Sequence, residues 1–145
     1  MATKQRIAYG ATIEWGTDGT TYASIPEAEG LAVPEVQVEY IDVTNMDSAG
    51  GFREFIAGLK DAGEITIPCG YTSAAYATAV GYQTNGTLVY FRTELPLETG
   101  QSTTGDIFVF TGYVTPRLQT NAVGEAIKMD LVIRTSGNVT FTAGS

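Results

Sequence analysis

The sequence predicts a mainly β fold, a sandwich or barrel of short strands with one helix beside it. Turn-forming residues recur at short intervals along the 145 residues, 17 of which are glycine. Between the turns, several segments alternate polar and apolar residues, the pattern of a strand with one buried face. Helical periodicity is confined to one segment. Roughly eight short strands and a single helix are typical of a sandwich or barrel.

The chain is expected to form one domain spanning residues 1–145. A chain of this length can bury about two-thirds of its unfolded surface in a single core. No internal repeat, linker or change of composition divides it.

The first two expected strands lie at residues 12–15 and 31–43. A tight-turn composition, Gly16-Thr17-Asp18-Gly19, ends the first of them. The second strand has two distinct faces, with Val36, Val38 and Tyr40 on one and Glu35, Gln37 and Glu39 on the other. Pro34 has no backbone N–H, so we expect the start of this strand at a sheet edge or a bulge.

Five further strands are expected at residues 64–69, 87–92, 107–114, 125–134 and 138–142. In the first of these, Ile65 and Ile67 should point inward. The segments at 87–92 and 107–114 are apolar on both faces over part of their length, which indicates cover on both sides. The strand at 125–134 should place Ile127, Met129, Leu131 and Ile133 on one side and Lys128, Asp130, Val132 and Arg134 on the other.

The helix is predicted at residues 73–81. Alanine dominates this segment and has the highest helix propensity. Thr72 or Ser73 can cap its start, and either Gly81 or Asn85-Gly86 can end it.

Residues 42–63 form the most informative segment, which we expect to be a long loop between two strands. About twenty residues is long for a connection in a compact domain, and such loops are usually functional or disordered. Disorder is disfavoured because Phe52, Phe55, Ile56 and Leu59 need apolar surroundings. Apolar anchors combined with glycines and mixed charges indicate a segment that docks on a partner.

Composition excludes several classes of function. Acidic residues outnumber basic ones 16 to 8, a formal charge of −8, so the chain is unsuited to binding nucleic acid through its phosphates. It has no histidine, the commonest general base and transition-metal ligand, and its one cysteine excludes an intrachain disulfide. We therefore expect no catalytic, metal or cofactor site, and we interpret Cys69 as a small buried apolar residue.

Paired carboxylates do not change this interpretation. Glu27 and Glu29 lie in an expected loop, and Glu35 and Glu39 would be about 13 Å apart along a strand. A retaining glycosidase pair requires about 5 Å. Trp15 and the eight tyrosines could form a sugar-binding platform, but in an alternating β protein such residues usually belong to cores and interfaces.

No targeting or membrane segment is expected. Residues 1–6 are basic enough to begin a signal peptide, but the residues that follow do not form an apolar run of sufficient length. No stretch approaches the roughly 20 apolar residues of a membrane span. We therefore expect the protein to be made and to fold in the cytoplasm.

The segment around the long loop resembles the major tail tube proteins of long, non-contractile-tailed bacteriophages. The resemblance rests on residues 38–47 and 51–67, which run strand, Asp-Val-Thr, polar link, aromatic-rich loop, Gly-Leu-Lys-Asp-Ala-Gly, strand. It covers about thirty residues, and the rest of the chain fits more loosely through its length, early hairpin, mid-chain helix and closing strands. The related tube of a gene transfer agent would look the same. The chain departs from the family in its small size, and we expect no immunoglobulin-like decoration domain after the last strand.

The resemblance implies a tail tube fold, a β-sandwich flanked by a helix. Six copies would form a ring, and rings would stack into a hollow tube through which genomic DNA passes without specific binding. Partners would be other copies of the chain and the tail terminator, tape-measure and distal tail proteins, with no membrane contact. The protein would reside in the virion tail after assembly in the host cytoplasm.

Three segments would make the contacts between subunits and rings: the assembly loop at 42–63, the N-terminal arm at residues 1–10 and the C-terminal residues. Within the loop, the implied contact residues are Asp42, Met46, Asp47, Phe52, Arg53, Glu54, Phe55, Ile56, Leu59, Lys60 and Asp61.

An acidic lumen would keep DNA from adhering to the tube wall. The leading candidates for the lumen are Glu35, Gln37 and Glu39, on one polar strand face, followed by Glu125 and Asp130.

Two alternatives remain open alongside the phage tube. A type VI secretion tube protein would share the architecture but conduct effector proteins. A carbohydrate-binding β-sandwich would need a secretion route and would leave the 42–63 segment unexplained.

Overall fold

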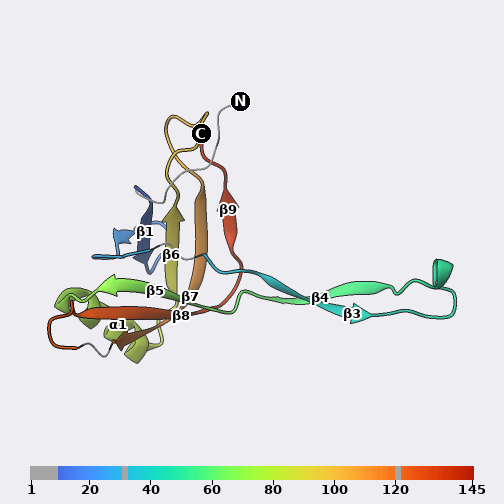
Figure 1. Ribbon diagram of the computed structural model, residues 1–145, viewed down its shortest axis with the longest axis horizontal. Coiled ribbons are helices and arrows are strands. Elements are labelled where there is room, and N and C mark those ends of the chain that lie inside the picture. Colours follow the sequence, from blue (N-terminus) through green and yellow to red (C-terminus); the bar gives the residue numbers. More distant parts are fainter. Residues whose placement is uncertain (1–9, 31–32, 120–121) are drawn as a thin grey trace.

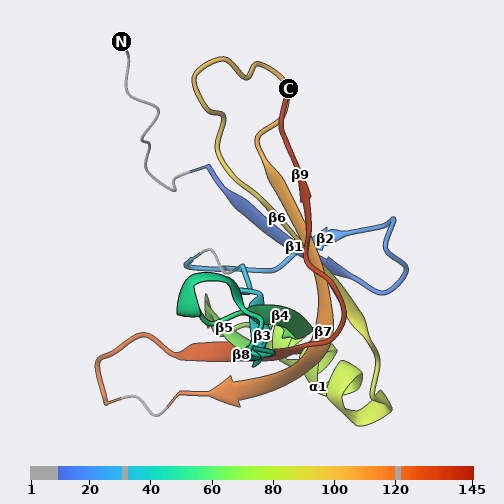
Figure 2. The same cartoon turned by 90° about the vertical axis from the view of Figure 1, so that its right-hand side faces the viewer.

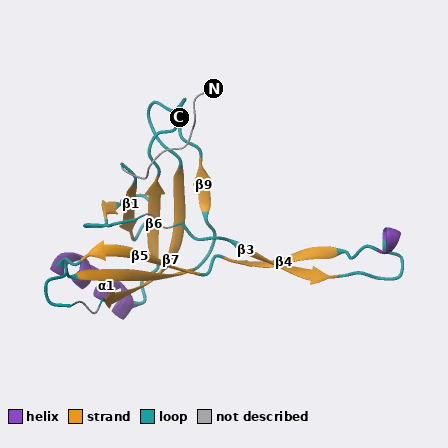
Figure 3. Ribbon diagram, in the orientation of Figure 1, coloured by secondary structure: helices purple, strands orange, loops and turns teal. Residues whose placement is uncertain are grey.

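The computed structural model describes residues 10–30, 33–119 and 122–145 (Figure 1). In these residues the fold is mainly β with one α-helix, which confirms the predicted fold class (Figure 3). The strands are β1 (Thr12–Gly16), β2 (Ala23–Ser24), β3 (Gln37–Asp42), β4 (Phe55–Asp61), β5 (Glu64–Gly70), β6 (Val89–Glu94), β7 (Ile107–Leu118), β8 (Lys128–Thr135) and β9 (Thr140–Thr142). The helix is α1 (Ser73–Asn85), and a short 3-10 turn, η1, spans Ala49–Gly51. Of the expected N-terminal arm, residues 1–9 lie outside the described residues.

Seven strands form one antiparallel sheet in the order β2-β1-β6-β7-β8-β5, with β9 paired to the start of β7. β7 belongs to both halves of this sheet, because residues 107–112 pair with β6 and residues 112–118 pair with β8. Figure 2 shows β7 curving between the two halves. Gly112 lies where the partner changes, and a Cβ there would come within 2.7 Å of the carbonyl oxygen of Arg134. A glycine therefore permits the close approach of β8 at this point.

The core forms where the two halves of the sheet meet α1. Phe91 and Phe110 stack with ring centroids 5.3 Å apart, and Trp15 meets Tyr82 of α1 edge to face at 5.5 Å. The other large apolar side chains that are fully buried are Ile67, Met129, Leu131, Ile133 and Val89. Cys69 is also fully buried, as expected. The alternation predicted for the strands at 64–69 and 125–134 thus identified Ile67, Met129, Leu131 and Ile133 correctly as core residues, while Ile65 is half-buried and Ile127 is exposed. We call the seven-stranded sheet with α1 the body.

The helix begins where it was predicted and ends later. The Thr72 hydroxyl accepts a hydrogen bond from the Ala75 amide at 3.3 Å, which confirms the predicted cap. The chain continues through Gly81 as helix and stops at Gly86, whose φ of 63° lies in the left-handed region. Of the two possible ends, the Asn85-Gly86 pair is the one used. Only glycine adopts this conformation at little cost, so Gly86 provides the stop signal.

The 42–63 segment differs in part from the expected loop. Residues 55–61 form β4, which pairs with β3 in a separate two-stranded sheet that projects from the body (Figures 1 and 3). β4 does not alternate polar and apolar residues, because neither of its faces packs on a core, so periodicity could not identify it. The strand expected at 31–43 is correspondingly shorter and begins at Gln37.

Candidate functional site

The β3–β4 hairpin, residues 37–61, is the candidate functional site, and we call it the arm. Eleven of its thirteen strand residues are exposed, with only Val38 and Gly58 half-buried. The exposed residues include Tyr40, Ile41, Phe55, Ile56 and Leu59, the last with 83% of its surface accessible. An isolated two-stranded hairpin is at best marginally stable in water, and large exposed apolar patches mark interaction sites. The arm therefore has the properties of a surface that a partner covers.

Both faces of the outer arm are apolar. Ile41 lies directly opposite Ile56 on one face, while Tyr40 opposes Ala57 on the other. Phe55 shares the face of Tyr40, since it lies two residues from Ala57 along β4. A partner contacting only one face would leave the other in water, so the geometry suits an arm inserted between neighbouring surfaces.

A β-bulge divides the arm into an inner and an outer part. Val38 pairs with Lys60 and Tyr40 pairs with Ala57, so two residues of β4, Gly58 and Leu59, face Glu39 alone. A bulge increases the local right-handed twist and bends the strand that carries it. A Cβ on Gly58 would lie 3.3 Å from the carbonyl oxygen of Glu39, which favours glycine at this position.

Hydrogen bonds within the subunit order the arm's tip, residues 43–54. The Glu54 amide donates to the Thr44 hydroxyl at 2.7 Å, and the Val43 amide donates to the Glu54 carbonyl oxygen at 2.9 Å. The Ser48 hydroxyl donates to the Glu54 carboxylate at 3.1 Å. Hydrogen bonds from Thr44 to the Asp42 carboxylate lower the pKa of that group. The polar groups of the tip thus bond mainly to one another, and the apolar side chains point outward.

Each residue implied as a contact lies on the arm. Phe52 is 75% exposed and Met46 fully exposed at the tip, and Arg53 reaches Asp42 at 3.8 Å. Asp47 and Lys60 are also exposed. Asp61 ends β4 at the root, where it pairs with Arg134 of the body at 3.2 Å. Which of these residues contact a neighbouring subunit stays a prediction.

The five lumen candidates fall into two groups. Glu35, Gln37 and Glu39 are exposed at or near the arm's root, where Glu35 and Gln37 line a shallow hollow with Asp61 and Glu64. Glu125 lies in the β7–β8 connection, at the opposite end of the body in Figure 1, and accepts a hydrogen bond from the Ala122 amide at 3.2 Å. One subunit therefore does not bring the five together.

Asp130 differs from the other lumen candidates because its carboxylate is held inside the subunit. Its side chain is 10% exposed and accepts hydrogen bonds from Arg117 at 2.7 Å and from Gln119 at 2.8 Å. The Arg117 hydrogen bond is the main reason that the pKa of Asp130 lies below its usual range. The charge of Asp130 is thus largely offset by Arg117.

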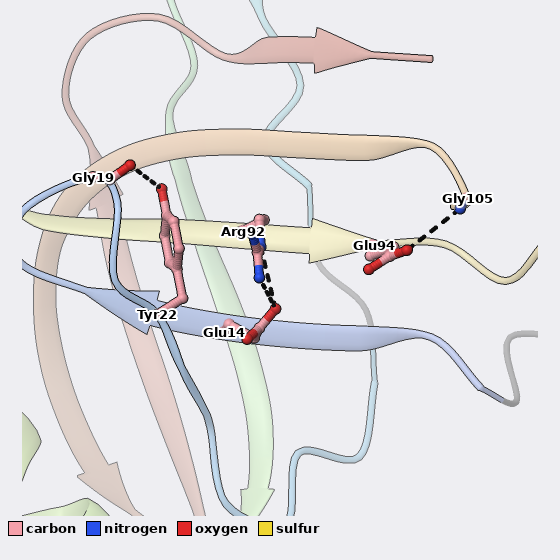
Figure 4. A network of polar contacts seen from close by, with 6 residues as sticks. All are labelled: Glu14, Gly19, Tyr22, Arg92, Glu94 and Gly105. Carbon is pink, nitrogen blue, oxygen red and sulfur yellow. Dashed lines mark hydrogen bonds and ion pairs between the residues drawn. The ribbon is translucent and has the colours of Figure 1, made fainter. Parts of the chain in front are cut away.

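Sequence reasoning missed a polar network on β1 and β6, shown in Figure 4. Arg92 donates to Glu14 through two nitrogens, at 2.7 and 3.2 Å, and its guanidinium lies 4.6 Å from the centre of the Tyr22 ring. Tyr22 in turn donates to the Gly19 carbonyl oxygen at 3.3 Å. Glu14 and Arg92 lie directly opposite each other, so this network stabilises the register of β1 on β6. Only the register reveals the pair, since 78 residues separate its members.

An apolar row at the far end of the body was also missed. Ile127, expected on the same strand side as Met129, Leu131 and Ile133, is 62% exposed, and the Tyr71 amide donates to its carbonyl oxygen at 3.1 Å. Leu118, opposite Met129, is exposed as well. Ile127 and Leu118 thus lie on the same side of the sheet as the buried Met129, but beyond the edge of the core, where they are exposed to solvent.

Within the described residues, no cluster of three or more acidic, cysteine or histidine side chains could hold a metal ion. No helix among them is long and apolar enough to span a membrane.

Comparisons with known proteins show the fold. No protein-family model matches the sequence, and no curated protein matches it. A chain in the baseplate of the anti-feeding prophage superimposes with a TM-score of 0.73 at 9% identity, covering 99% of this chain and 98% of that one. A chain in the tail of an empty gene transfer agent particle, solved with C6 symmetry, gives 0.72 at 19% identity, with 96% and 100% covered. A chain of the native gene transfer agent virion gives 0.70 at 16% identity, with the same coverage. The fold is therefore shared, along nearly the whole chain, with components of these particles.

Proposed function

We propose that the chain is a structural tail tube protein of a phage or gene transfer agent. Six copies form a ring, and the rings stack into a hollow tube through which genomic DNA passes. The observation that carries the proposal is the arm, whose apolar side chains lie exposed on both faces in the single subunit. The shared fold supports it, because one similar chain comes from a gene transfer agent tail with C6 symmetry.

Contacts between copies would cover the surfaces that one subunit leaves exposed. The arm projects from one end of the body, and the β7–β8 connection, at which Leu118 and Ile127 are exposed, lies toward the other (Figure 1). Different patches meeting head to tail generate closed rings or open stacks, depending on the rotation between copies. Association would also protect the open strand edges of the body, which would otherwise favour aggregation.

The lumen wall would work by repulsion. A net charge of −8 copied six times gives a strongly negative ring, which prevents DNA from adhering. Glu35, Gln37 and Glu39 remain our first candidates for this wall, followed by Glu125. Asp130 would contribute less, because Arg117 offsets its charge.

The protein would therefore act through geometry and electrostatics, without catalytic turnover. It would be assembled in the host cytoplasm and reside in the virion tail. There it would meet the tail terminator, tape-measure and distal tail proteins.

Electron microscopy of concentrated purified protein tests the proposal. We expect hollow rods or six-fold rings from the wild type, and only single subunits from Phe52→Asp, because a charge would replace an apolar contact at the tip. Phe52→Leu is the matched control and should still assemble. Circular dichroism should show the same fold for all three proteins, since Phe52 is 75% exposed in the single subunit. A wild type that stays monomeric at high concentration, even with virion extract, would overturn the proposal.

A further inference from the structure

The arm joins the body through a two-residue hinge on its β4 side. β4 ends at Asp61 and β5 begins at Glu64, so the chain changes direction over Ala62 and Gly63. Gly63 has a φ of 69°, in the left-handed region that side chains disfavour. Ala62 is buried, with 7% of its surface accessible. On the β4 side, the change of direction is thus confined to these two residues.

Asp61 is tied to both sides of this hinge. Its Oδ1 accepts a hydrogen bond from the Gly63 amide at 2.9 Å, and its Oδ2 lies 3.2 Å from the Arg134 guanidinium of β8. The Thr135 amide donates to the Gly63 carbonyl oxygen at 2.9 Å, which attaches the hinge itself to β8. Of the ion pairs in the described part of the chain, Asp61–Arg134 is the one that joins the arm to the body.

The choice of partner by Arg134 is informative. In the β5–β8 ladder, Arg134 lies directly opposite Glu64, where a cross-strand ion pair would be expected. Its guanidinium instead contacts Asp61, beyond the hinge. Asp61, Glu35 and Glu64 line the same hollow at the arm's root. Without Arg134 these carboxylates would repel one another, and swinging the arm would relieve that repulsion.

We propose that Arg134 and Asp61 form a latch that holds the arm in one direction relative to the body. The latch orients the arm in the free subunit, so the arm already has its docking direction when another copy of the chain binds. Both side chains are more than half exposed, so the latch is weak and sensitive to salt. Its role in docking rests on the proposed tube function, whereas the direction of the arm is a property of the single subunit.

Pulsed electron paramagnetic resonance on dilute subunits measures the direction of the arm. Spin labels at Met46→Cys on the tip and Gln83→Cys on α1 report the distance between arm and body, and buried Cys69 stays unlabelled. We expect a narrow distance distribution in the otherwise wild-type protein and a broader one in Arg134→Gln and in Asp61→Asn. The Asn side chain can still accept the Gly63 hydrogen bond through its oxygen, so Asp61→Asn keeps the bond within the hinge and removes the charge and the Oδ2 acceptor that Arg134 contacts.

Two further variants make the test specific. Arg53→Gln removes the other ion pair of the arm, 3.8 Å from Asp42 within the tip, and should leave the distribution narrow. The reversed pair, Asp61→Arg with Arg134→Asp, should restore much of the narrow distribution. An unchanged distribution in both Arg134→Gln and Asp61→Asn would overturn the latch.

Assembly is measured separately on the same variants. Loss of the latch should raise the protein concentration needed for tubes by up to about fivefold, the upper limit for one exposed ion pair. Salt screens the repulsion between the acidic subunits in both proteins, so the informative quantity is the difference between them, which should disappear in high salt. Broader distances with no tubes from any protein would uphold the latch and refute the tube. Tubes that form while the distance distributions stay unchanged would uphold the tube function and refute the latch.

Discussion

Asp130→Asn provides a sharp test of how this subunit uses its acidic residues. The wild-type carboxylate accepts hydrogen bonds from Arg117 at 2.7 Å and Gln119 at 2.8 Å, with its side chain 10% exposed. An asparagine would turn an amide N–H₂ toward one of these donors, so at least one hydrogen bond is lost along with the charge.

The contacts set the expected magnitude. A hydrogen bond to a charged group contributes about 1.5–3 kcal/mol. The Arg117 side chain is 62% exposed, so the contribution of its ion pair with Asp130 is reduced toward the roughly 0.2–1 kcal/mol of surface ion pairs. We therefore expect Asp130→Asn to lower the free energy of unfolding by about 2 kcal/mol. For a chain of this size that corresponds to a Tm lower by about 4–8 °C.

The loss should also depend on pH. The pKa of Asp130 in the folded protein is lowered, mainly by the Arg117 hydrogen bond, below its value in the unfolded chain. The stability that the carboxylate contributes is therefore fully present above about pH 4 and disappears as the pH falls through the folded pKa. The difference between wild type and variant should be largest near neutral pH and shrink on acidification.

Urea unfolding of wild type and variant at pH 7 and at pH 3 measures both effects. Glu125→Gln is the matched control, because Glu125 is an exposed lumen candidate, and its change should stay within about 0.5 kcal/mol. A loss below about 0.5 kcal/mol for Asp130→Asn, or one that does not shrink with acid, would refute the structural role. Asp130 would then return to the lumen candidates on equal terms with Glu125.

Two further predictions concern the lumen and the core. Glu35→Lys combined with Glu39→Lys should still permit tube assembly but slow DNA delivery, because cations in the tube wall attract the phosphates of DNA. The infectivity of reconstituted particles measures this effect, and unchanged infectivity would contradict the placement of these residues in the lumen. Phe110→Ala should lower the free energy of unfolding by about 3–5 kcal/mol, because the ring is fully buried and stacks on Phe91. Urea unfolding measures this loss, and a loss under about 1 kcal/mol would contradict the place of Phe110 in the core.

The strands of the body were predictable because one of their faces meets the core. In β5, Ile67 and Cys69 alternate with exposed or half-buried neighbours, and in β8 Met129, Leu131 and Ile133 are fully buried. Burial on one side imposes a period of two on the sequence, and that period can be read without the fold. The helix was predictable for a local reason too, since Thr72 caps it within one turn.

Asp130 shows where the same period misleads. Alternation placed Asp130 on the side of β8 opposite to Met129 and Leu131, and its side chain does point to that side. Its burial, however, depends on Arg117 and Gln119 from the end of β7 and the residue beyond it. Strand pairing brings them together across more than ten residues of sequence, and alternation carries no information about that.

By itself the sequence determined the mainly β class and the side of β5 and β8 that faces the core. It also determined the residues at which α1 could begin and end, and it identified residues 42–63 as the candidate functional segment. Each of these follows from local patterns of polarity, caps and turns, or from resemblance within one segment. Only the tertiary structure decided that much of this segment is a two-stranded arm. β4 has no core beneath it to impose a period on its side chains, so its pairing with β3 alone defines it as a strand. The direction of the arm likewise depends on Arg134, which lies 73 residues from Asp61 and meets it only because β8 pairs with β5.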